Sequence, residues 1–482
     1  MNVLQVSAEI FPLLKTGGLA DVAGALPGAL NGVGCDVRVL LPGFPSILED
    51  LRDSAVVAEL TAPWGEPSVL RFGRLSSVGV MAYVIDAPAM YCRPGTPYED
   101  VNRRPFTDNY RRFALLGWVG GQLAAGLDSH WQPRVVHSHD WHAALVSAYM
   151  AFAPARRAHV ASVYTIHNLA YQGVFAPRHF YELGLPSTAF ALDGLEFHGQ
   201  LSFMKAGLFY SDHITTVSPT YAREIQTFAQ GCGLDGLLRS RSAELTGILN
   251  SVDESVWNPA TDLAIAQTYD THKPAGKAQC KLALQQELGL AEQTDAPLFG
   301  VVSRLTEQKG LHLVLAALDD LVAQGGQLVV LGTGDTALEG AFLERAAAHP
   351  QSVSVRVGYD ERYAHRVFAG TDVTLVPSRF EPCGLTQLYG LKYGSLPLVH
   401  HVGGLADTVV DSSLENLVDG SANGFVFHQF DTPALSRAIR RAFALYGRKT
   451  DWRAVRTRGM GQALGWDHAA AEYMALYRSL CP

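Results

Sequence analysis

Cysteine is scarce in this chain, and the cysteines that it has are scattered. Among 482 residues there are six, with no Cys-x-x-Cys pair and no spacing typical of a zinc site. This pattern argues against a disulfide framework and against a structural metal, and it favours free thiols in a reducing compartment. The six are Cys35, Cys92, Cys232, Cys280, Cys383 and Cys481.

Long apolar runs and runs of one charge are also missing. The least polar stretch, Ala114 to Leu127, contains Gln122 and is too short to span a bilayer. The first residues, Met1 to Phe11, are interrupted by Glu9 and are typical of a strand rather than a signal peptide. The net charge is -8 and no long Lys/Arg run occurs, which disfavours a nucleic-acid or membrane partner. We therefore expect a cytoplasmic protein; its oligomeric state stays open.

Two nucleotide-binding motifs are absent. No Gly-x-x-x-x-Gly-Lys-Ser/Thr occurs, which excludes a P-loop ATPase. No Asp-x-Asp occurs either, although a protein that neutralises a diphosphate with a divalent ion needs oxygen ligands, usually carboxylates. If the chain binds a diphosphate, arginine and lysine are expected to neutralise it, with no obligatory metal and no cofactor.

The apolar runs predict an α/β fold with parallel strands. Apolar residues make up 48% of the chain and charged residues 17%, as in ordinary globular enzymes, and the length suits two domains. Short apolar runs alternate with longer helical stretches, which favours parallel strands with crossover helices. The first series of expected strands covers residues 3–7, 37–41, 81–85, 135–139, 160–166 and 214–217.

A second series of strands indicates a second domain. It covers residues 299–303, 328–331, 352–357, 373–376 and 396–400, after a connection with one helix at 255–296. We expect a first domain at 1–247, a second at 248–456, and a C-terminal segment, 457–482, that packs back on the first. Residues 452–480 have a helical pattern.

The string KTGGLAD follows the first expected strand. Gly17 and Gly18 let the backbone approach a ligand closely, Lys15 offers an ammonium to a phosphate, and Asp21 can bond a hydroxyl. The alternative is a glycine-rich turn with an exposed lysine. GGLADV at 17–22 is echoed by GGLADT at 403–408, either by chance or as two glycine-rich helix N-termini that face one cleft and suit an anion.

Two further motifs stand at strand ends of the second series. SRLTEQKG places Arg304 and Lys309 where parallel sheets bind ligands, unless it is an ordinary solvated loop. SRFEPCGLTQLYG places Glu381 before a helix start, where amide groups from Cys383 and Gly384 can grip an anion or a sugar. Glu381 can accept hydrogen bonds from sugar hydroxyls or stabilise a cationic sugar, or simply complement the helix dipole. For Cys383, a small buried thiol is favoured over a nucleophile.

Histidines gather at two other strand ends. HSHDWH contains His137, His139 and His142, and TIHNLAYQG contains His167. Without a matching carboxylate or cysteine set, metal binding is disfavoured, and a role in lining the cleft is weighed against a structural one. LGTGDTA at 331–337 matches a dinucleotide pattern, but it lies deep in the second series, so nicotinamide binding is disfavoured.

With these motifs the chain closely resembles the bacterial glycogen synthases and plant starch synthases that use ADP-glucose. The strings that carry the resemblance span nearly the whole chain: KTGGLADV, HSHDWH, TIHNLAYQG, GILN-x-VD, SRLTEQKG, GYDE, SRFEPCGLTQLYGLKYG and GGLADTV. The resemblance implies a glycosyltransferase-B fold, in which two Rossmann-like domains face a cleft. It also implies transfer of glucose from ADP-glucose to the nonreducing end of an α-1,4-glucan, with the α configuration retained.

The resemblance also implies roles for individual residues. Catalytic roles fall to Glu381, His167, Lys309, Arg304 and Asp140. Donor binding falls to Lys15, Gly18, Asp21, Asn250, Arg304, Lys309, Tyr359, Cys383, Gly384 and Thr386, with Tyr359 stacked on adenine. Acceptor binding falls to Asp140 and His139.

Some residues depart from the family pattern, and two rival functions stay open. The family commonly has Gly where this chain has Ser251, and Arg and Thr where it has His400 and Val402, which removes a cation near the cleft. The rivals are another sugar-phosphate enzyme of the same fold and a catalytically silent glucan-binding protein. The sequence does not decide the preference for ADP-glucose over UDP-glucose.

Overall fold

The computed structural model describes residues 1–153 and 160–481, and it divides into two compact units. The first unit is Met1–Asn250 together with Trp466–Pro482, and the second is Ser251–Gly465. The division after Asn250 lies close to the boundary expected at 247, and the chain returns to the first unit at its C-terminal end.

The first unit is built on a nine-stranded sheet in the order β12-β11-β7-β6-β1-β2-β5-β4-β3. All neighbours from β12 to β5 are parallel, whereas β4 pairs antiparallel with both β5 and β3. Its strands are β1 (Asn2–Val6), β2 (Asp36–Pro42), β3 (Leu51–Thr61), β4 (Pro67–Leu75), β5 (Val80–Asp86), β6 (Val135–His139), β7 (Ala161–Ile166), β11 (His213–Thr216) and β12 (Leu245–Gly247).

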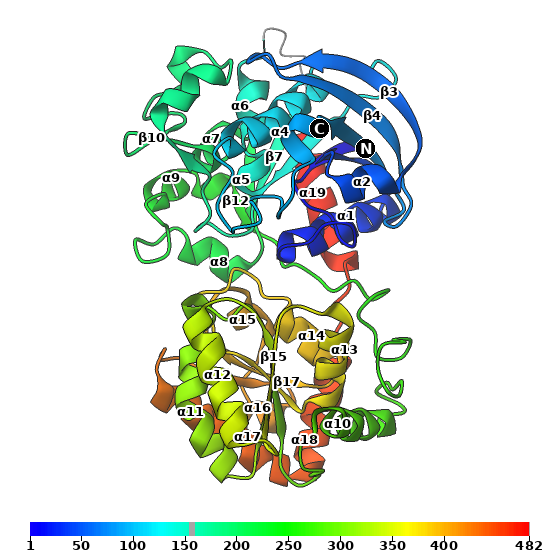
Figure 1. Ribbon diagram of the computed structural model, residues 1–482, viewed down its shortest axis with the longest axis vertical. Coiled ribbons are helices and arrows are strands. Elements are labelled where there is room, and N and C mark those ends of the chain that lie inside the picture. The colour runs from blue at the N-terminus through cyan, green and yellow to red at the C-terminus, as the bar shows by residue number, and fades with distance from the viewer. Residues whose placement is uncertain (154–159, 482) are drawn as a thin grey trace. The chain divides into compact units, whose positions relative to one another are not determined.

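All six strands predicted for this unit are present, but the antiparallel edge was not predicted. The long strands β3 and β4 form that edge of the sheet (Figure 1). β3 is exposed along most of its length and contains two register irregularities, so it lacks the apolar alternation that reveals a strand. A small sheet of β8 (Val174–Phe175), β10 (Gln200–Ser202) and β9 (Glu196–Phe197) also escaped prediction because its strands are so short.

The helices of the first unit lie mainly in the crossovers between parallel strands. They are α1 (Gly18–Gly32), α2 (Pro45–Asp50), α3 (Pro88–Tyr91), α4 (Asn109–Ala124), α5 (Asp140–Ala143), α6 (Leu145–Ala151), α7 (Phe203–Tyr210), α8 (Pro219–Glu224), α9 (Asp235–Ser240) and α19 (Asp467–Leu480), with 3₁₀ turns η1 (Pro177–Glu182), η2 (Ser187–Ala189) and η3 (Ser242–Glu244). The C-terminal helix α19 packs on α1, and its Tyr473 and Tyr477 are buried there with Leu26 and Leu30.

The second unit has a six-stranded, wholly parallel sheet in the order β15-β14-β13-β16-β17-β18. Five of its strands were predicted; β18, with three residues, was not. The strands are β13 (Leu298–Val302), β14 (Gln327–Gly332), β15 (Val353–Val357), β16 (Val373–Val376), β17 (Leu396–His400) and β18 (Phe425–Phe427).

Both faces of this sheet are buried, and β14 shows how. Leu328 and Val330 belong to an apolar cluster with α11 and α17, whereas Val329 and Leu331 belong to a cluster with α10 and α13. The helices are α10 (Ala275–Leu288), α11 (Leu311–Ala323), α12 (Thr336–Ala348), α13 (Glu361–Gly370), α14 (Thr386–Lys392), α15 (Gly403–Thr408), α16 (Leu414–Asp419), α17 (Thr432–Gly447) and α18 (Lys449–Met460), with the 3₁₀ turn η4 (Glu307–Lys309).

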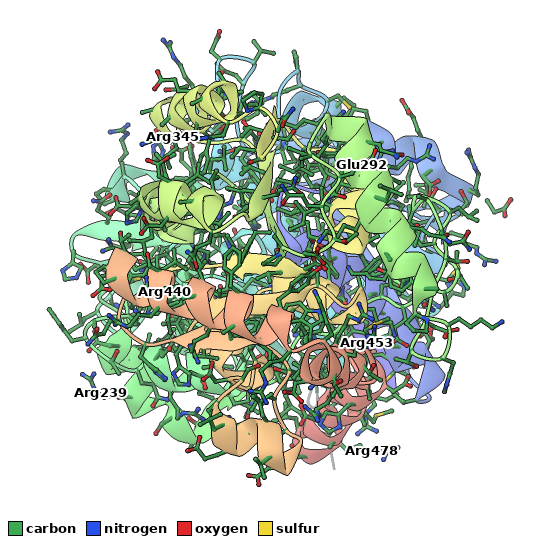
Figure 2. The ribbon with its side chains drawn as sticks, turned by 90° about the horizontal axis from the view of Figure 1, so that it is seen from below. Arg239, Glu292, Arg345, Arg440, Arg453 and Arg478 are labelled. Atoms are coloured by element: carbon green, nitrogen blue, oxygen red, sulfur yellow. The ribbon has the colours of Figure 1, made fainter. Side chains whose placement is uncertain are left out.

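The segment predicted as helical at 452–480 is two helices, α18 in the second unit and α19 in the first. Charged side chains such as Arg440 and Arg453 project outward from the ribbon (Figure 2), and both are exposed. Among residues 1–153 and 160–481, no helix combines the length and the apolar character needed to cross a membrane.

An aromatic stack fixes the connecting segment to the second unit. The Trp257 ring lies between His365 and Tyr389, with centroids 3.8 and 3.9 Å away and nearly parallel planes. Asp262 Oδ2 accepts hydrogen bonds from His365 Nδ1 at 2.7 Å and from the Tyr393 hydroxyl at 2.6 Å. The segment after Asn250 is therefore packed structure rather than a loose linker.

A buried ion pair between Lys281 and Asp372 yields a prediction about stability. Lys281 Nζ lies 2.7 Å from Asp372 Oδ2, and both side chains are 8% exposed. The same oxygen also accepts a hydrogen bond from the Leu298 amide. Asp372→Asn leaves a buried ammonium without its counter-charge, so we expect a loss of about 3–5 kcal/mol in the free energy of unfolding. Asp319→Asn, which breaks an exposed pair with Arg345, should cost less than about 1 kcal/mol. Urea unfolding midpoints check both; equal small shifts would contradict the argument.

Candidate active site

The predicted motifs of the second unit follow neighbouring strands. The loop 303–310 follows β13 and the loop 377–385 follows β16, and β13 pairs in parallel with β16. Carboxyl ends of parallel strands meet at one edge of the sheet, which is where open α/β sheets bind ligands. Distant parts of the sequence thus supply one group of side chains.

Lys309 and Glu381 form the centre of this group. Lys309 Nζ lies 2.6 Å from Glu381 Oε2, and the hydroxyl of Ser378 donates to the same oxygen at 2.8 Å. Glu381 is buried, with 7% of its surface exposed. A buried carboxylate is costly unless it is paired and hydrogen-bonded, and here the ammonium and the hydroxyl meet both needs at one oxygen.

Glycines allow two backbone segments to approach the backbone of the loop that carries Glu381. A Cβ on Gly403, whose φ is +44°, would lie 1.9 Å from the carbonyl oxygen of Glu381. The Gly404 amide donates to the carbonyl oxygens of Glu381 and Pro382, at 3.2 and 3.1 Å. A Cβ on Gly310 would lie 2.0 Å from the carbonyl oxygen of Pro377. The second GGLAD string therefore has a packing role beneath the Glu381 loop.

Gln387, which the sequence reasoning missed, braces the same loop from inside α14. Its Nε2 donates to the carbonyl oxygens of Cys383 and Gly384, at 3.0 and 2.7 Å. Gly384 has φ +75° and leaves no room for a Cβ, because the side-chain oxygen of Gln387 would lie 2.3 Å away. Cys383 is buried at 4% exposure, and the Thr386 hydroxyl reaches the carbonyl oxygen of Val302 at 3.5 Å.

Arg304 and Tyr359 lie on exposed loops of the same unit. Arg304 follows β13 by two residues, and Tyr359 follows β15 by two. Tyr359 is 60% exposed and comes directly after Gly358, whose φ is +129°. Both positions are at the carboxyl edge of the sheet, where the ring and the guanidinium are accessible to a ligand.

In the first unit, KTGGLAD forms the turn into α1. Gly18 is the first residue of α1, and no side chain caps that helix at Gly17. Lys15 Nζ lies 2.9 Å from Asp21 Oδ1, and both side chains are largely buried. The two predicted donor-binding residues therefore contact each other at an uncapped helix start, which suits an anion.

Glu9 and Tyr98 extend this group and were not predicted. Glu9 accepts hydrogen bonds from the Thr16 amide at 2.6 Å, from the Thr16 hydroxyl and from the Tyr98 hydroxyl. Tyr98 also stacks on His142, with ring centroids 4.7 Å apart. Tyr98 lies in an irregular segment far along the chain, so the sequence held no signal that would pair it with Glu9.

His139, Asp140 and His167 lie together at the ends of β6 and β7. His139 Nδ1 is 3.0 Å from His167 Nε2. Burial lowers the pKa of His139 well below its usual value and that of His167 to about 3, so both imidazoles are neutral. Asp140 has φ +60°; burial raises its pKa to about 8, despite hydrogen bonds from the amides of Asn168 and His167. Asn250, at the end of this unit, is buried.

The structure also bears on the histidine cluster and on the loop that matches a dinucleotide pattern. Within residues 1–153 and 160–481, no three His, Cys, Asp or Glu side chains gather in a way that could hold a metal ion. In the loop 331–337, Glu339 accepts hydrogen bonds from the Gly334 amide at 2.7 Å and from the Thr333 hydroxyl at 2.8 Å. A Cβ on Gly332 would lie 2.0 Å from the Ser303 carbonyl oxygen. The glycines there serve close packing.

His400, one of the departures from the family pattern, is buried inside the second unit. Its Nδ1 lies 2.8 Å from the Ser378 carbonyl oxygen, and its Nε2 lies 3.3 Å from the His428 carbonyl oxygen. Burial lowers its pKa, so the ring is neutral at neutral pH. Position 400 thus supports the Glu381 loop through Ser378 and supplies no positive charge.

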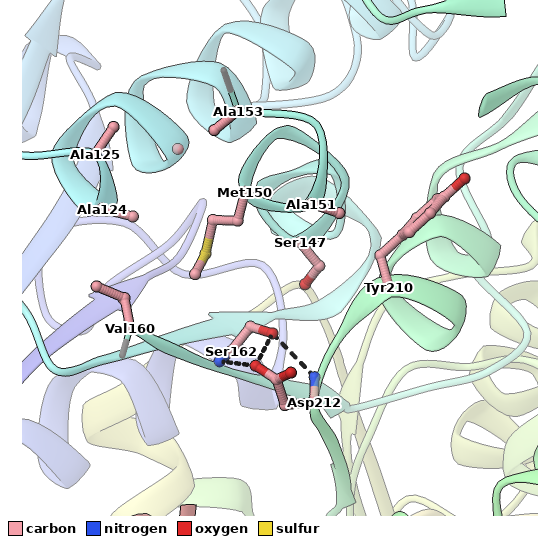
Figure 3. A pocket seen from close by; sticks show the side chains of 11 residues that line it. Ala124, Ala125, Ser147, Met150, Ala151, Ala153, Val160, Ser162, Tyr210 and Asp212 are labelled. Carbon is pink, nitrogen blue, oxygen red and sulfur yellow. Dashed lines mark hydrogen bonds between the residues drawn. The ribbon is translucent and has the colours of Figure 1, made fainter. Parts of the chain in front are cut away.

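A small pocket in the first unit lies apart from these motifs (Figure 3). It is lined mainly by small and apolar side chains such as Ala125 and Met150, with Ser147, Ser162 and Asp212 as polar groups, and none of the predicted site residues lines it. Asp212 Oδ2 already accepts the amide and hydroxyl of Ser162. With a volume of about 30 Å³, the pocket has room for a water molecule rather than a sugar.

Comparisons with known proteins identify the family and the fold. Residues 2–240 match the family described as starch synthase catalytic domain, and residues 286–454 match glycosyl transferases group 1. The catalytic domain of starch synthase IV from Arabidopsis thaliana, solved bound to ADP and acarbose, is 30% identical, covers 99% of both chains and superposes with a TM-score of 0.90. A sucrose-phosphate synthase from Thermosynechococcus elongatus, 17% identical with a TM-score of 0.58, shares the fold.

Fold and motifs together define a glycosyltransferase of the GT-B class. The glycogen synthase of Variovorax paradoxus is 63% identical over 99% of this chain and 98% of its own length. The glycogen synthase of Francisella tularensis is 55% identical over 100% of this chain and 99% of its own length. The chain belongs to the glycogen and starch synthase family.

The close packing at Gly403 yields a second prediction. Gly403→Ala places a Cβ against the Glu381 carbonyl at a left-handed φ, so we expect a loss of about 2 kcal/mol or more in the free energy of unfolding, together with displacement of the Glu381 loop. Gly340→Ala, inside α12 with no atom within 4 Å of the new Cβ, should be neutral or stabilising by up to about 1 kcal/mol. Thermal unfolding compares the two; a tolerated Gly403→Ala refutes the packing role.

The raised pKa of Asp140 yields a third prediction. The folded protein keeps this carboxyl protonated to about pH 8, whereas the unfolded chain releases the proton near 3.8. Its contribution to stability is therefore complete below 3.8 and is lost as pH rises toward 8. Asp140→Asn, which mimics the protonated form and tolerates a left-handed φ, should gain stability relative to the parent across this range and level off above it. Unfolding free energies measured from pH 4 to 9 test this; a flat difference contradicts it.

Proposed function

We propose that this protein transfers glucose from ADP-glucose to the nonreducing 4-hydroxyl of an α-1,4-glucan such as glycogen, with retention of the α configuration and release of ADP. The observation that carries the proposal is the contact of Lys309 with the buried Glu381, in the loops that follow β13 and β16, supported by Ser378 and by the glycines of the second GGLAD string. The full-length glycogen synthase relatives and the ADP-bound starch synthase supply the substrate class.

Most of the candidate site residues are assigned to binding the donor, ADP-glucose. Arg304 and Lys309 of the second unit and Lys15 of the first are assigned to the diphosphate, with Gly18 beside it. Tyr359 is assigned to the adenine face, because an exposed aromatic ring offers a stacking surface. The remaining donor contacts are assigned to Asp21, Asn250, Glu381, Cys383, Gly384, Thr386 and His167.

The acceptor is assigned to the first unit. His139 and Asp140 lie beside His167 at the ends of β6 and β7. Neutral imidazoles and a protonated carboxyl are donors and acceptors suited to uncharged sugar hydroxyls. A charged cluster at this position would favour an anion instead, so the lowered histidine pKa values support a glucan.

The mechanism follows from the charges that the site can supply. Loss of ADP develops negative charge on the leaving phosphate, and fixed ammonium and guanidinium groups stabilise that charge. The acceptor hydroxyl then attacks from the face that the leaving group vacates, and a phosphate oxygen of ADP takes its proton. Glu381 stabilises the cationic sugar centre without forming a bond to it. Isolation of a glucosyl ester on Glu381 would end this scheme.

We further propose that the reaction needs no metal ion and that it takes place in the cytoplasm. The cations assigned to the diphosphate perform the charge neutralisation for which other transferases use a divalent ion and carboxylate ligands. Activity in excess chelator should equal activity with magnesium. A strict loss in chelator, restored by magnesium, would refute the metal-free scheme while leaving the transfer reaction intact.

A direct assay tests the proposed function. Purified protein is incubated with glycogen and either ADP-glucose or UDP-glucose, and released nucleotide is measured against glucose incorporated. We expect equal amounts of ADP and incorporated glucose. Glycogen binding without nucleotide release would indicate a silent glucan-binding protein, and nucleotide release without incorporation would indicate a hydrolase.

Glu381 yields the fourth prediction. Glu381→Gln keeps the size of the side chain but removes the charge that balances Lys309, so kcat should fall by about 100-fold or more. Glu344→Gln, at an exposed position on α12, is the matched control and should stay within about twofold of the parent. Steady-state kinetics with ADP-glucose and glycogen measure both; a Glu381→Gln enzyme with parental kcat removes Glu381 from the mechanism.

A further inference from the structure

A chain of buried polar side chains runs through the core of the first unit, below the strand ends just described. His137 Nδ1 lies 2.7 Å from the hydroxyl of Tyr477, and His137 Nε2 lies 2.5 Å from the hydroxyl of Thr165. The Thr165 hydroxyl is in turn 2.5 Å from that of Thr215. All four residues are fully buried, and they come from β6, β7, β11 and the C-terminal helix α19.

His137 is neutral in this environment. Burial lowers its pKa to about 3, and burial raises the pKa of the Tyr477 phenol, so neither group is charged near neutral pH. A neutral imidazole carries one N–H and one lone pair, and each hydroxyl beside it can donate or accept, so hydrogen bonds at both nitrogens hold the His137 ring in a single orientation. Apolar packing alone would leave the two orientations of the ring nearly equivalent.

The orientation of the His137 ring affects the predicted site because His139, the next residue on the same face of β6, packs against it. Residues 137 and 139 point to the same side of the strand, and their rings are 4.2 Å apart between centroids, with planes inclined at 37°. His139 then bonds His167 at 3.0 Å, while its Nε2 is buried and has no hydrogen-bond partner among the described residues. One side of the His139 ring is thus set by His137 and one nitrogen by His167.

Tyr477 enters this arrangement from the far end of the chain. It lies on α19, which belongs to the first unit although the 215 residues of the second unit, 251–465, come before it in the sequence. The neighbouring Tyr473 also contacts the His137 ring, at 5.3 Å between centroids, but the phenol bonded to Nδ1 is that of Tyr477. Apolar side chains would be enough to pack α19 on α1, so packing alone does not explain the buried hydroxyl of Tyr477.

We infer that Tyr477 is a positioning residue for the reaction: its hydroxyl fixes the ring orientation of His137, and the packed ring of His137 holds His139 and, through it, His167 in the geometry that contacts the sugars. This inference rests on the proposed function. It assigns Tyr477 no contact with substrate, because the residue is fully buried and acts through His137.

The test compares Tyr477→Phe with Tyr473→Phe. Both remove one phenol oxygen from the same face of α19, but only Tyr477→Phe removes the bond to His137 Nδ1. We expect Tyr477→Phe to lower kcat about tenfold, with KM for ADP-glucose within about twofold, because a misplaced contact residue costs rate more than binding. Tyr473→Phe should keep the parental kcat. Thr165→Val, which removes the partner at Nε2, should repeat the loss.

A spectroscopic measurement separates positioning from general damage. Nitrogen NMR of protein labelled with ¹⁵N-histidine reports the protonation and hydrogen bonding of each ring nitrogen. We expect Tyr477→Phe to change the signals of His137 and of the His139–His167 pair, and Tyr473→Phe to leave them in place. Parental kcat and unchanged histidine signals in Tyr477→Phe would overturn the inference, as would equal losses in both variants. If the parent protein releases no ADP, the proposed function fails, whereas the histidine signals still decide the role of Tyr477.

Discussion

The ion pair between Lys309 and Glu381 is the interaction around which the candidate site of the second unit is built. A buried carboxylate is costly unless it is paired, and here Lys309 and the hydroxyl of Ser378 reach the same oxygen of Glu381, which is 7% exposed. Three segments converge to make this possible: the loop after β13, the loop after β16 and the glycines at the start of α15. The proposed function assigns the phosphate to this cation and the sugar to this carboxylate.

The same short string serves different purposes in the two units. At the start of α1, GGLAD forms an uncapped helix start where Lys15 pairs with Asp21. At α15, the glycines of GGLAD let backbone approach backbone, and the Gly404 amide donates to the loop that carries Glu381. The buried His400 adds a further support through the Ser378 carbonyl. Similar strings therefore need not imply similar contacts, even within one protein.

From the sequence, the two motifs of the second unit could be placed at the ends of parallel strands, as they are in the structure. Adjacent strands bring their carboxyl ends together, so the proximity of Lys309 to Glu381 follows once β13 and β16 are neighbours. Sequence reasoning failed for contacts that depend on irregular or distant segments. Tyr98 reaches Glu9 from a stretch without periodicity, Gln387 looks like an ordinary helix residue, and the edge strand β3 is too exposed to show alternation. Tyr477 contacts His137 from the last helix, and no local sequence pattern predicts that contact.

The central claim is that the group around Glu381 and Lys309 serves retaining transfer of glucose from ADP-glucose to a glucan end. The most direct measurement is proton NMR of the purified protein with ADP-glucose and a short α-1,4-linked glucan, in which the anomeric signal of each new linkage is followed as ADP appears. The account predicts new α-1,4 linkages in step with ADP. A new β linkage, or ADP accompanied by free glucose alone, would contradict it.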